Sequence, residues 1–375
     1  MNKRSSSVEL LRIIAMFFII ASHFSVHSEF DLHSITNANT FSAIFLRTTV
    51  MGYVGINVFM SIFGYFNITE NSYSKTISRS FRIVLQVFFY SVLIYGVFVV
   101  LQIIDFKFSD MIKVCLPVSL DEYGFPTVYI IVALISPIIN SGIINLSIDQ
   151  RRIMLIVCLL IWSIIPTLSL GHINHYGTTL GQYILMYILG GIIRIDYSKS
   201  ESSKKKQGGY MVGVSSICLI IVAIIYTVIE NMSISFIPSI MVFYSRYSIF
   251  SIMLACGLLM IFTGISIESR IINIIGSLTF GIYLIHDNRF VRDVLWTDWL
   301  NCKQYSLYWY FPFYAIFIVI CVFVICGAIE FLRKKCFDEL FQQLSSHSVN
   351  WLRNLWFYVR ELPVESSTKQ MHPRV

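Results

Sequence analysis

The sequence predicts an all-α integral membrane protein, a polytopic bundle of about ten transmembrane helices. Of its 375 residues, 56% are hydrophobic and only 13% are charged, and the mean hydropathy is +0.71. The apolar residues occur in stretches of about 20 residues, the length at which a helix spans the hydrocarbon core of a bilayer. This composition excludes a disordered chain and disfavours an ordinary soluble enzyme.

Ten apolar segments are candidates for these spans. Their approximate bounds are 8–26, 51–68, 83–104, 126–145, 153–170, 180–195, 210–229, 242–265, 271–287 and 309–331. The segments 51–68 and 271–287 contain several glycines, which allow membrane helices to pack closely. No small-residue cleavage site ends the first segment, so we expect a retained helix and not a secretory signal.

The positions of Lys and Arg predict that both chain termini face the cytoplasm. Alternate connecting segments, beginning with the N-terminal one, carry most of the basic residues. We therefore divide the chain into a transmembrane domain at 1–337 and a cytoplasmic tail at 338–375. The lysine-rich run Ser198–Gly208 is predicted to be a solvated hinge between two halves of the bundle.

The tail has apolar residues at helical spacing, namely Trp351, Leu355, Val359 and Leu362. This pattern suits an amphipathic helix on the inner membrane surface, and it equally suits a short helix packed on the inner loops.

The net charge of +7 and the eight cysteines suggest no further partner. The basic residues lie where they set membrane orientation, so we expect no nucleic-acid binding. The cysteines are scattered without a CxxC pair, which indicates neither a zinc site nor a disulfide framework. We expect no metal cofactor.

Arg12 and His23, both in the first span, are the most informative pair in the chain. Eleven helical residues turn by about 1100°, which is about 20° beyond three full turns. The two side chains therefore share one helix face and stand about 16 Å apart along it. Ionisable groups inside a bilayer usually face a bundle interior or a wet cavity. The pair predicts a polar path through the bundle.

Each member of this pair also has a structural interpretation. His23 suits proton transfer near neutral pH, but it is alternatively a neutral histidine bonded to a neighbouring helix. Arg12 lies three residues after Glu9, and the two are either an ion pair at the helix end or an anchor for a phosphate or an acyl carbonyl.

Other basic residues are candidates for a clamp on an anionic ligand arriving from the cytoplasm. They are Arg79, Arg82, Arg151 and Arg152. By position alone, all four are also ordinary positive-inside residues. On the opposite side, Arg246 lies near the start of the eighth span and His286 ends the ninth. The predicted topology places His23 and His286 together in the outer part of the bundle.

The sequence lacks several motifs that would indicate other functions. It has no phosphate-binding P-loop, no G-x-S-x-G elbow, no HExxH and no dinucleotide glycine motif. An ATP-driven pump, a serine hydrolase and a metalloprotease are therefore disfavoured.

Five segments in order resemble the membrane acyltransferase-3 family, over about residues 5 to 330. They are Glu9 and Arg12 with His23 in the first span, Gly55–Phe66, the Arg79/Arg82 pair, Thr127–Asn140 and Gly276–His286. One departure is in the second span, where that family commonly has Ser-Gly-Tyr or Ser-Gly-Phe. Here Phe63 precedes Gly64 and Tyr65, so any role for the serine falls to Ser61 on another face or is absent.

The resemblance implies a membrane-bound O-acyltransferase that moves acetyl from cytoplasmic acetyl-CoA to a hydroxyl of an extracellular or lipid-linked polysaccharide. It implies His23 as general base, with Arg12 and Glu9 as its companions. Arg79, Arg82, Arg151 and Arg152 would hold the donor; His286, Tyr283 and Arg246 would lie on the acceptor side. It also implies a multi-pass protein of a bacterial plasma membrane.

Two other functions fit a polytopic bundle with central polar residues. One is a transporter or translocator of a lipid-linked sugar or small metabolite. The other is a non-catalytic partner in a glycan-synthesis complex. Consumption of a thioester separates an enzyme from a transporter, and the intact Arg12/His23 pair disfavours the non-catalytic partner.

Overall fold

The computed structural model describes residues 5–49, 52–170, 180–196, 201–231 and 240–361, and all regular structure within these ranges is helical. The α-helices are α1 (Ser6–His27), α2 (Leu32–Ala38), α3 (Thr40–Thr49), α4 (Gly52–Asn67), α5 (Tyr73–Val100), α6 (Phe108–Cys115), α7 (Gly124–Asn145), α8 (Ile148–Leu159), α9 (Ile165–Leu168), α10 (Leu180–Asp196), α11 (Glu201–Asn231), α12 (Ile249–Thr263), α13 (Arg270–Gly276), α14 (Thr279–His286), α15 (Arg289–Val294) and α16 (Phe311–Glu361). Short π-helical segments are Leu160–Ile164 and Leu295–Trp299, and short 3₁₀ segments are Ile240–Tyr244 and Cys302–Tyr305.

Eight helical segments within the described residues are long and apolar enough to cross a membrane. They are Ser6–His27, Thr40–Asn67, Tyr73–Val100, Gly124–Asn145, Ile148–Leu168, Ser202–Ile229, Val242–Thr263 and Phe311–His347. The predicted sixth span corresponds to α10, which has 17 residues, and the ninth corresponds to the shorter pair α13 and α14. The all-helical membrane fold is confirmed; the count of ten and the orientation stay predictions.

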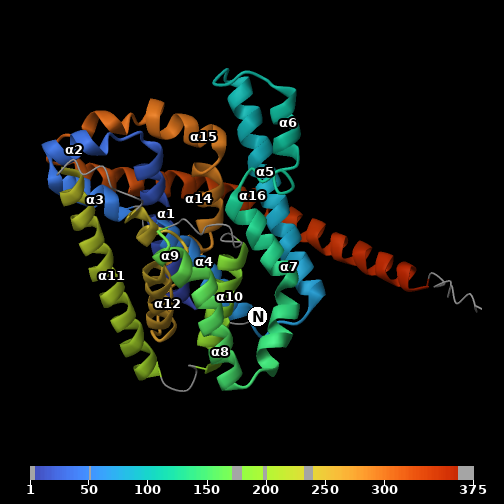
Figure 1. The fold of residues 1–375 in the computed structure, drawn as a ribbon. Helices are drawn as coiled ribbons and strands as arrows, with labels where there is room; N and C mark the ends of the chain where they lie inside the picture. The colour runs from blue at the N-terminus through green and yellow to red at the C-terminus, as the bar shows by residue number, and fades with distance from the viewer. Residues whose placement is uncertain (1–4, 50–51, 171–179, 197–200, 232–239, 362–375) are drawn as a thin grey trace, which may run out of the picture.

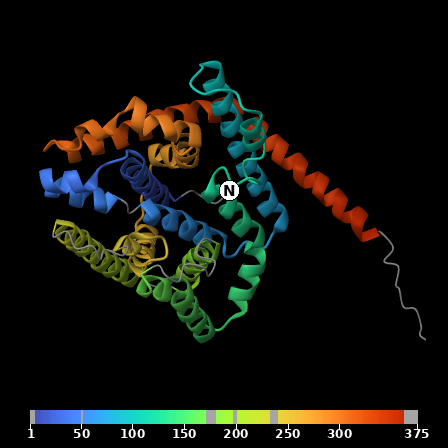
Figure 2. The ribbon, with the colours of Figure 1, turned by 45° about the horizontal axis from the view of Figure 1, so that its top comes forward.

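Helices α1 and α4 pack against each other at the centre of the bundle. Helices α12, α13, α14 and α16 also pack on α1, whereas α10 packs on α4 (Figure 1). Figure 2 shows α11 on the outside of the bundle, and α16 continuing well beyond the other helices. The apolar face of α1 is fully buried, with Leu11, Ala15 and Ile20 among its least exposed residues.

Glycines allow α4 and α10 to approach backbone to backbone, as the sequence predicted for the second span. A Cβ atom on Gly64 would lie 1.8 Å from the Tyr187 carbonyl oxygen, and one on Gly190 would lie 1.9 Å from that of Ser61. No side chain fits such gaps, so these two positions set the separation of the helices.

Two features of the N-terminal part of the fold differ from the sequence prediction. Helices α2 and α3 follow the first span, and no helix was predicted there. Helix α5 begins at Tyr73, about ten residues before the predicted span, because the Ser72 hydroxyl accepts a hydrogen bond from the Lys75 amide and caps it.

The predicted hinge at Ser198–Gly208 is wrong for Glu201 to Gly208, which form the first turns of α11, although Lys205 and Lys206 are exposed as predicted. The Lys204 side chain is only 4% exposed, and its ammonium lies 5.0 Å from the centre of the Tyr65 ring. An aromatic face stabilises the buried cation, and this contact holds the segment against the bundle. Residues 198–200 lie outside the described residues, as does the tail beyond Glu361. Up to Glu361, the tail is a continuation of α16.

The glycine contacts give a stability prediction. Gly64→Ala forces α4 and α10 apart, and overpacking of this kind costs about 1–3 kcal/mol. We expect a lower midpoint of thermal unfolding for the detergent-solubilised protein. Gly96→Ala is the matched control, because Gly96 is an exposed helical glycine with no atom within 4 Å of the added Cβ. Equal midpoints for the two variants would contradict the packing argument.

Candidate active site

A cavity of about 610 Å³ opens into the bundle and is lined by α1, α4, α5, α7, α13 and α14. Glu9, Arg12 and Arg79 are its charged lining residues. Aromatic side chains line much of the rest, namely Phe59, Phe63, Phe66, Phe125, Tyr129, Phe280 and Tyr283. The cavity follows α1 from Glu9 as far as Ile19. It therefore has a cationic end and an aromatic passage that extends toward His23.

Arg12 projects from α1 into the cavity and forms an ion pair with Glu9. Arg12 Nη1 donates to Glu9 Oε1 at 2.9 Å, and the Arg12 side chain keeps 31% of its surface exposed. Glu9 itself is buried against Gly276, where a Cβ atom would lie 2.5 Å from Glu9 Oε2. The ion pair thus orients the guanidinium without covering it, and its free donors face the cavity.

Arg79 reaches the same end of the cavity from α5, and a polar network orients it. Its Nη1 donates to Asn67 Oδ1 at 3.1 Å, and its Nη2 lies 3.8 Å from Glu70 Oε2. The Asn67 amide nitrogen donates in turn to the Ser136 and Tyr187 hydroxyls. Because Asn67 is almost completely buried, these bonds fix the direction of its carbonyl, and so of Arg79.

Glu70 lies in the connection between α4 and α5. A hydrogen bond from the Ser72 amide, together with the Lys75 and Arg79 cations, lowers the pKa of its carboxyl group. Glu70 therefore stays ionised near neutral pH and reduces the positive charge that Arg79 presents.

His23 and His286 form a hydrogen-bonded pair between α1 and α14. His23 Nδ1 and His286 Nε2 are 3.1 Å apart, and His286 Nδ1 lies 2.6 Å from the Ile282 carbonyl oxygen. A carbonyl oxygen only accepts, so in the neutral pair the proton of His286 is on Nδ1 and its Nε2 accepts from His23. The proton of His23 is then on Nδ1, and its Nε2 carries a free lone pair. This is the tautomer that a general base requires.

Tyr283 connects the cavity to the histidine pair. It lines the cavity, and its ring centre lies 6.5 Å from that of His23 and 6.1 Å from that of His286. Asp287 adds a carboxylate oxygen 3.5 Å from His23 Nδ1. Tyr283 therefore lines the same cavity as Arg12 and lies beside the pair of His23 and His286, neither of which is among the lining residues of the cavity.

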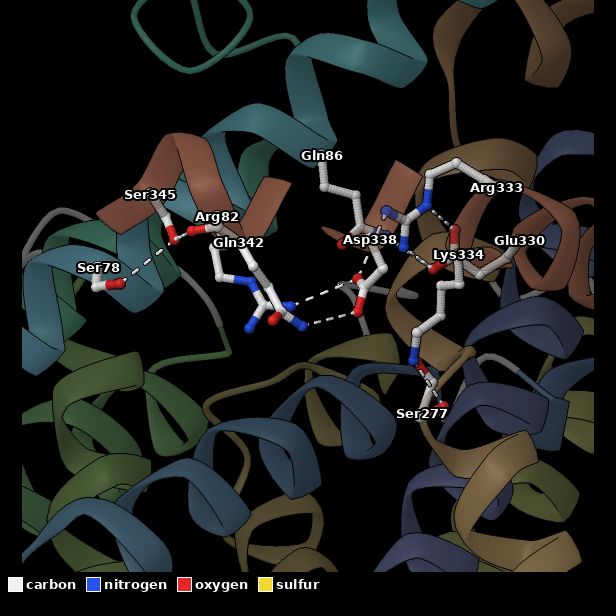
Figure 3. A network of polar contacts seen from close by, with 10 residues as sticks. All are labelled: Ser78, Arg82, Gln86, Ser277, Glu330, Arg333, Lys334, Asp338, Gln342 and Ser345. Atoms are coloured by element: carbon white, nitrogen blue, oxygen red, sulfur yellow. Dashed lines mark hydrogen bonds and ion pairs between the residues drawn. The ribbon is translucent and has the colours of Figure 1, made fainter. Parts of the chain in front are cut away.

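Arg82 lies outside this cavity lining and belongs to a network on α16 (Figure 3). Its Nη2 donates to Asp338 Oδ1 at 3.4 Å, and Asp338 also lies 4.0 Å from Arg333. Arg333 makes two hydrogen bonds to the buried Glu330 carboxylate, at 2.6 and 3.0 Å. Arg82 thus links α5 to the C-terminal part of α16 through a hydrogen bond from its guanidinium to the Asp338 carboxylate.

The remaining predicted residues also lie outside the cavity lining. Arg151 is buried and pairs with Asp196 at 2.7 Å, whereas the exposed Arg152 lies 3.5 Å from Asp149. Arg246 lies over the Tyr53 ring and bonds the Tyr183 hydroxyl at 3.3 Å. The structure therefore does not bring these three arginines to the histidine pair or to Arg79.

A family model described as an acyltransferase domain matches residues 5–329 of the chain. The chain belongs to the acyltransferase-3 family. Searches of curated proteins and of solved structures found no match. The matched range confirms the extent of the resemblance seen in the sequence, and it contains all the residues that line the cavity.

The acyltransferase-3 motif in α4 departs from the family pattern without opening a place for Ser61. Ser61 is completely buried, and its hydroxyl donates to the Val58 carbonyl at 2.9 Å. Phe63 occupies the cavity wall, with its ring centre 4.5 Å from that of Tyr129. In this acyltransferase-3 protein the passage is therefore aromatic at Phe63.

Sequence reasoning did not single out Asn67 or Asp287. A buried asparagine carries no distinctive signal, since its role depends on partners from α5, α7 and α10. Asp287 did carry one, because an acidic residue follows His286 directly.

The buried Glu330–Arg333 pair of Figure 3 and the exposed Asp149–Arg152 pair each join residues three positions apart on a helix. We expect them to contribute very differently to stability. Glu330→Ala leaves Arg333 buried without its main partner, which costs about 3–5 kcal/mol. Asp149→Ala removes the exposed partner of Arg152, which costs about 0–1 kcal/mol. Thermal unfolding in detergent should show a clear loss for the first variant only. A similar small shift for both would argue against a buried Glu330–Arg333 pair.

Proposed function

We propose that this membrane acyltransferase moves acetyl from cytoplasmic acetyl-CoA to a hydroxyl of an extracellular or lipid-linked polysaccharide. The single observation that carries the proposal is the cavity that begins at Arg12 and Arg79 and reaches Tyr283, whose ring centre lies 6.5 Å from that of His23. The cavity offers an anion site and a passage, and the proton acceptor lies beyond Tyr283. Donor and acceptor identity rest on the family resemblance.

The cationic end suits the phosphate groups of the donor. Guanidinium groups bind phosphate through charge-assisted hydrogen bonds, and Arg12 and Arg79 both have exposed donors. The aromatic passage suits the thioester arm, because apolar walls exclude the water that would hydrolyse it. The passage extends along α1 toward the histidine pair, where the acyl group would arrive.

The transfer needs one base and no redox chemistry. His23 Nε2 takes the proton of the acceptor hydroxyl while the oxygen attacks the thioester carbonyl carbon. The new C–O bond forms, the C–S bond breaks, and the imidazolium returns the proton to the departing thiolate. The products are an O-acetyl ester and free CoA. His286 keeps Nδ1 of His23 protonated by accepting its hydrogen bond, and so keeps Nε2 available.

His23→Ala should lower acetyl transfer by about 10²- to 10⁴-fold, the usual contribution of a general base. The measurement is release of free CoA by protein in nanodiscs supplied with acetyl-CoA and isolated surface glycan, with mass spectrometry of the glycan. His33→Ala is the control, since His33 is exposed on α2 and contacts Asn37. A folded His23→Ala variant with normal transfer would end the proposal. Transport of a sugar without any CoA release by the wild type would favour a translocator instead.

Arg79→Ala should raise KM for acetyl-CoA about 10- to 100-fold, because a charge-assisted hydrogen bond contributes about 1.5–3 kcal/mol. Asn67→Ala should raise the same KM less, since it only loosens the orientation of Arg79. Arg152→Ala serves as the comparison and should change KM less than twofold (order of magnitude from exposed pairs). Initial rates across a range of acetyl-CoA concentrations give these values. A larger effect at Arg152 than at Arg79 would place donor binding outside the cavity.

A further inference from the structure

Three side chains, one of them from the histidine pair, lie close enough together to hold a metal ion. His23, His27 and Asp287 each offer one ligand atom, and these atoms all lie within 4.8 Å of one another. His23 and His27 are four residues apart on α1, so they share a helix face, and their ring centres are 5.4 Å apart. Asp287 follows the last residue of α14 and completes the group from a second helix.

This set of ligands matches the chemistry of zinc. Zn²⁺ binds two imidazoles and a carboxylate at about 2.0–2.2 Å, with the fourth position open to water. Ligand atoms in such a site are about 3.3 Å apart, so small side-chain rotations would close the group. Arg292 lies 3.9 Å from Asp287 Oδ1 and 3.7 Å from Asp293. It has an alternative carboxylate partner when a cation takes Asp287.

We propose that His23, His27 and Asp287 form a zinc-binding site whose occupancy switches off acyl transfer. The metal is an inhibitor and not a cofactor of the reaction. Binding stands on the three ligands alone, whereas the inhibitory half of this inference rests on the proposed function of His23.

Ligation of either nitrogen of His23 removes the base. A metal on Nε2 takes the lone pair that would accept the proton. A metal on Nδ1 displaces the proton from that nitrogen, so the neutral ring carries its proton on Nε2. The Nδ1–H donation to His286 is lost in this second case as well. Metal binding and proton acceptance therefore exclude each other.

The group is accessible to a hydrated ion. The side chains of His23 and Asp287 are 18% and 14% exposed, and His27 in the last turn of α1 is half-buried. In the predicted orientation this end of the bundle is the outer one. The sensed metal would then be extracellular.

Binding is tested first, without reference to activity. Purified protein in nanodiscs is titrated with Co²⁺, whose visible absorption reports ligation, and Zn²⁺ is added to displace it. We expect wild type and His33→Ala to bind alike, and His27→Ala and Asp287→Asn to bind at least tenfold more weakly. Circular dichroism and thermal unfolding of each variant separate loss of ligands from loss of fold. Equal binding by wild type and folded His27→Ala, or no saturable binding by wild type, overturns the site.

Inhibition is tested second, by CoA release with Zn²⁺ or with a chelator. Zn²⁺ should suppress the activity of wild type and His33→Ala and leave that of His27→Ala at least tenfold less sensitive. Saturable binding without inhibition overturns the switch and leaves the site in place. Absence of any CoA release by chelated wild type overturns the proposed function, and the Co²⁺ titration still decides the metal site.

Discussion

The row of hydrogen bonds from the Ile282 carbonyl through His286 to His23 is the constraint on which the site depends. A carbonyl oxygen has no proton to give, so it fixes the proton of His286, and that ring fixes the proton of His23. The two histidines are 263 positions apart and come from different helices. The row therefore exists only while α14 and α13 remain docked on α1. The contact of Gly276 with Glu9 secures that docking at the cationic end.

Pairing decides which of the many arginines is available to an anionic ligand. Arg151 and Arg333 are buried, and each is bonded to a carboxylate on its own helix or a neighbouring one. A buried guanidinium is tolerated only with such a partner, and the partner occupies its donors. Arg12 and Arg79 instead meet carboxylates at one edge and keep the rest of the guanidinium in an open cavity. Positive-inside counting treats Arg79 and Arg151 alike, so it cannot rank them.

The sequence allowed the all-helical membrane fold and the α1 face with Arg12 and His23 to be predicted, because both follow from local periodicity. The partnership of His23 with His286 was predicted only as a shared side of the membrane. The hydrogen bond between the two histidines depends on how deep α14 lies in the bundle. The break between α13 and α14 sets this depth, and no single segment of the sequence predicts it. The ion pairs of Arg82 with Asp338 and of Arg151 with Asp196 could not be predicted for the same reason, since the partners lie far apart in the sequence. Lys204 looked solvated because its partner, Tyr65, is on another helix.

The proposed catalysis and the proposed metal binding both require that His23 presents an imidazole lone pair to an incoming species. In the proposed mechanism the thioester arrives through the aromatic passage, so the acceptor hydroxyl comes to the ring from the end where His27 and Asp287 lie. An acceptor hydroxyl and a small cation would therefore compete for one approach. Burying His23 further would exclude the cation, but it would also exclude the acceptor. In the proposed mechanism, the same access that lets His23 accept a proton from the acceptor also exposes it to inhibition by a metal.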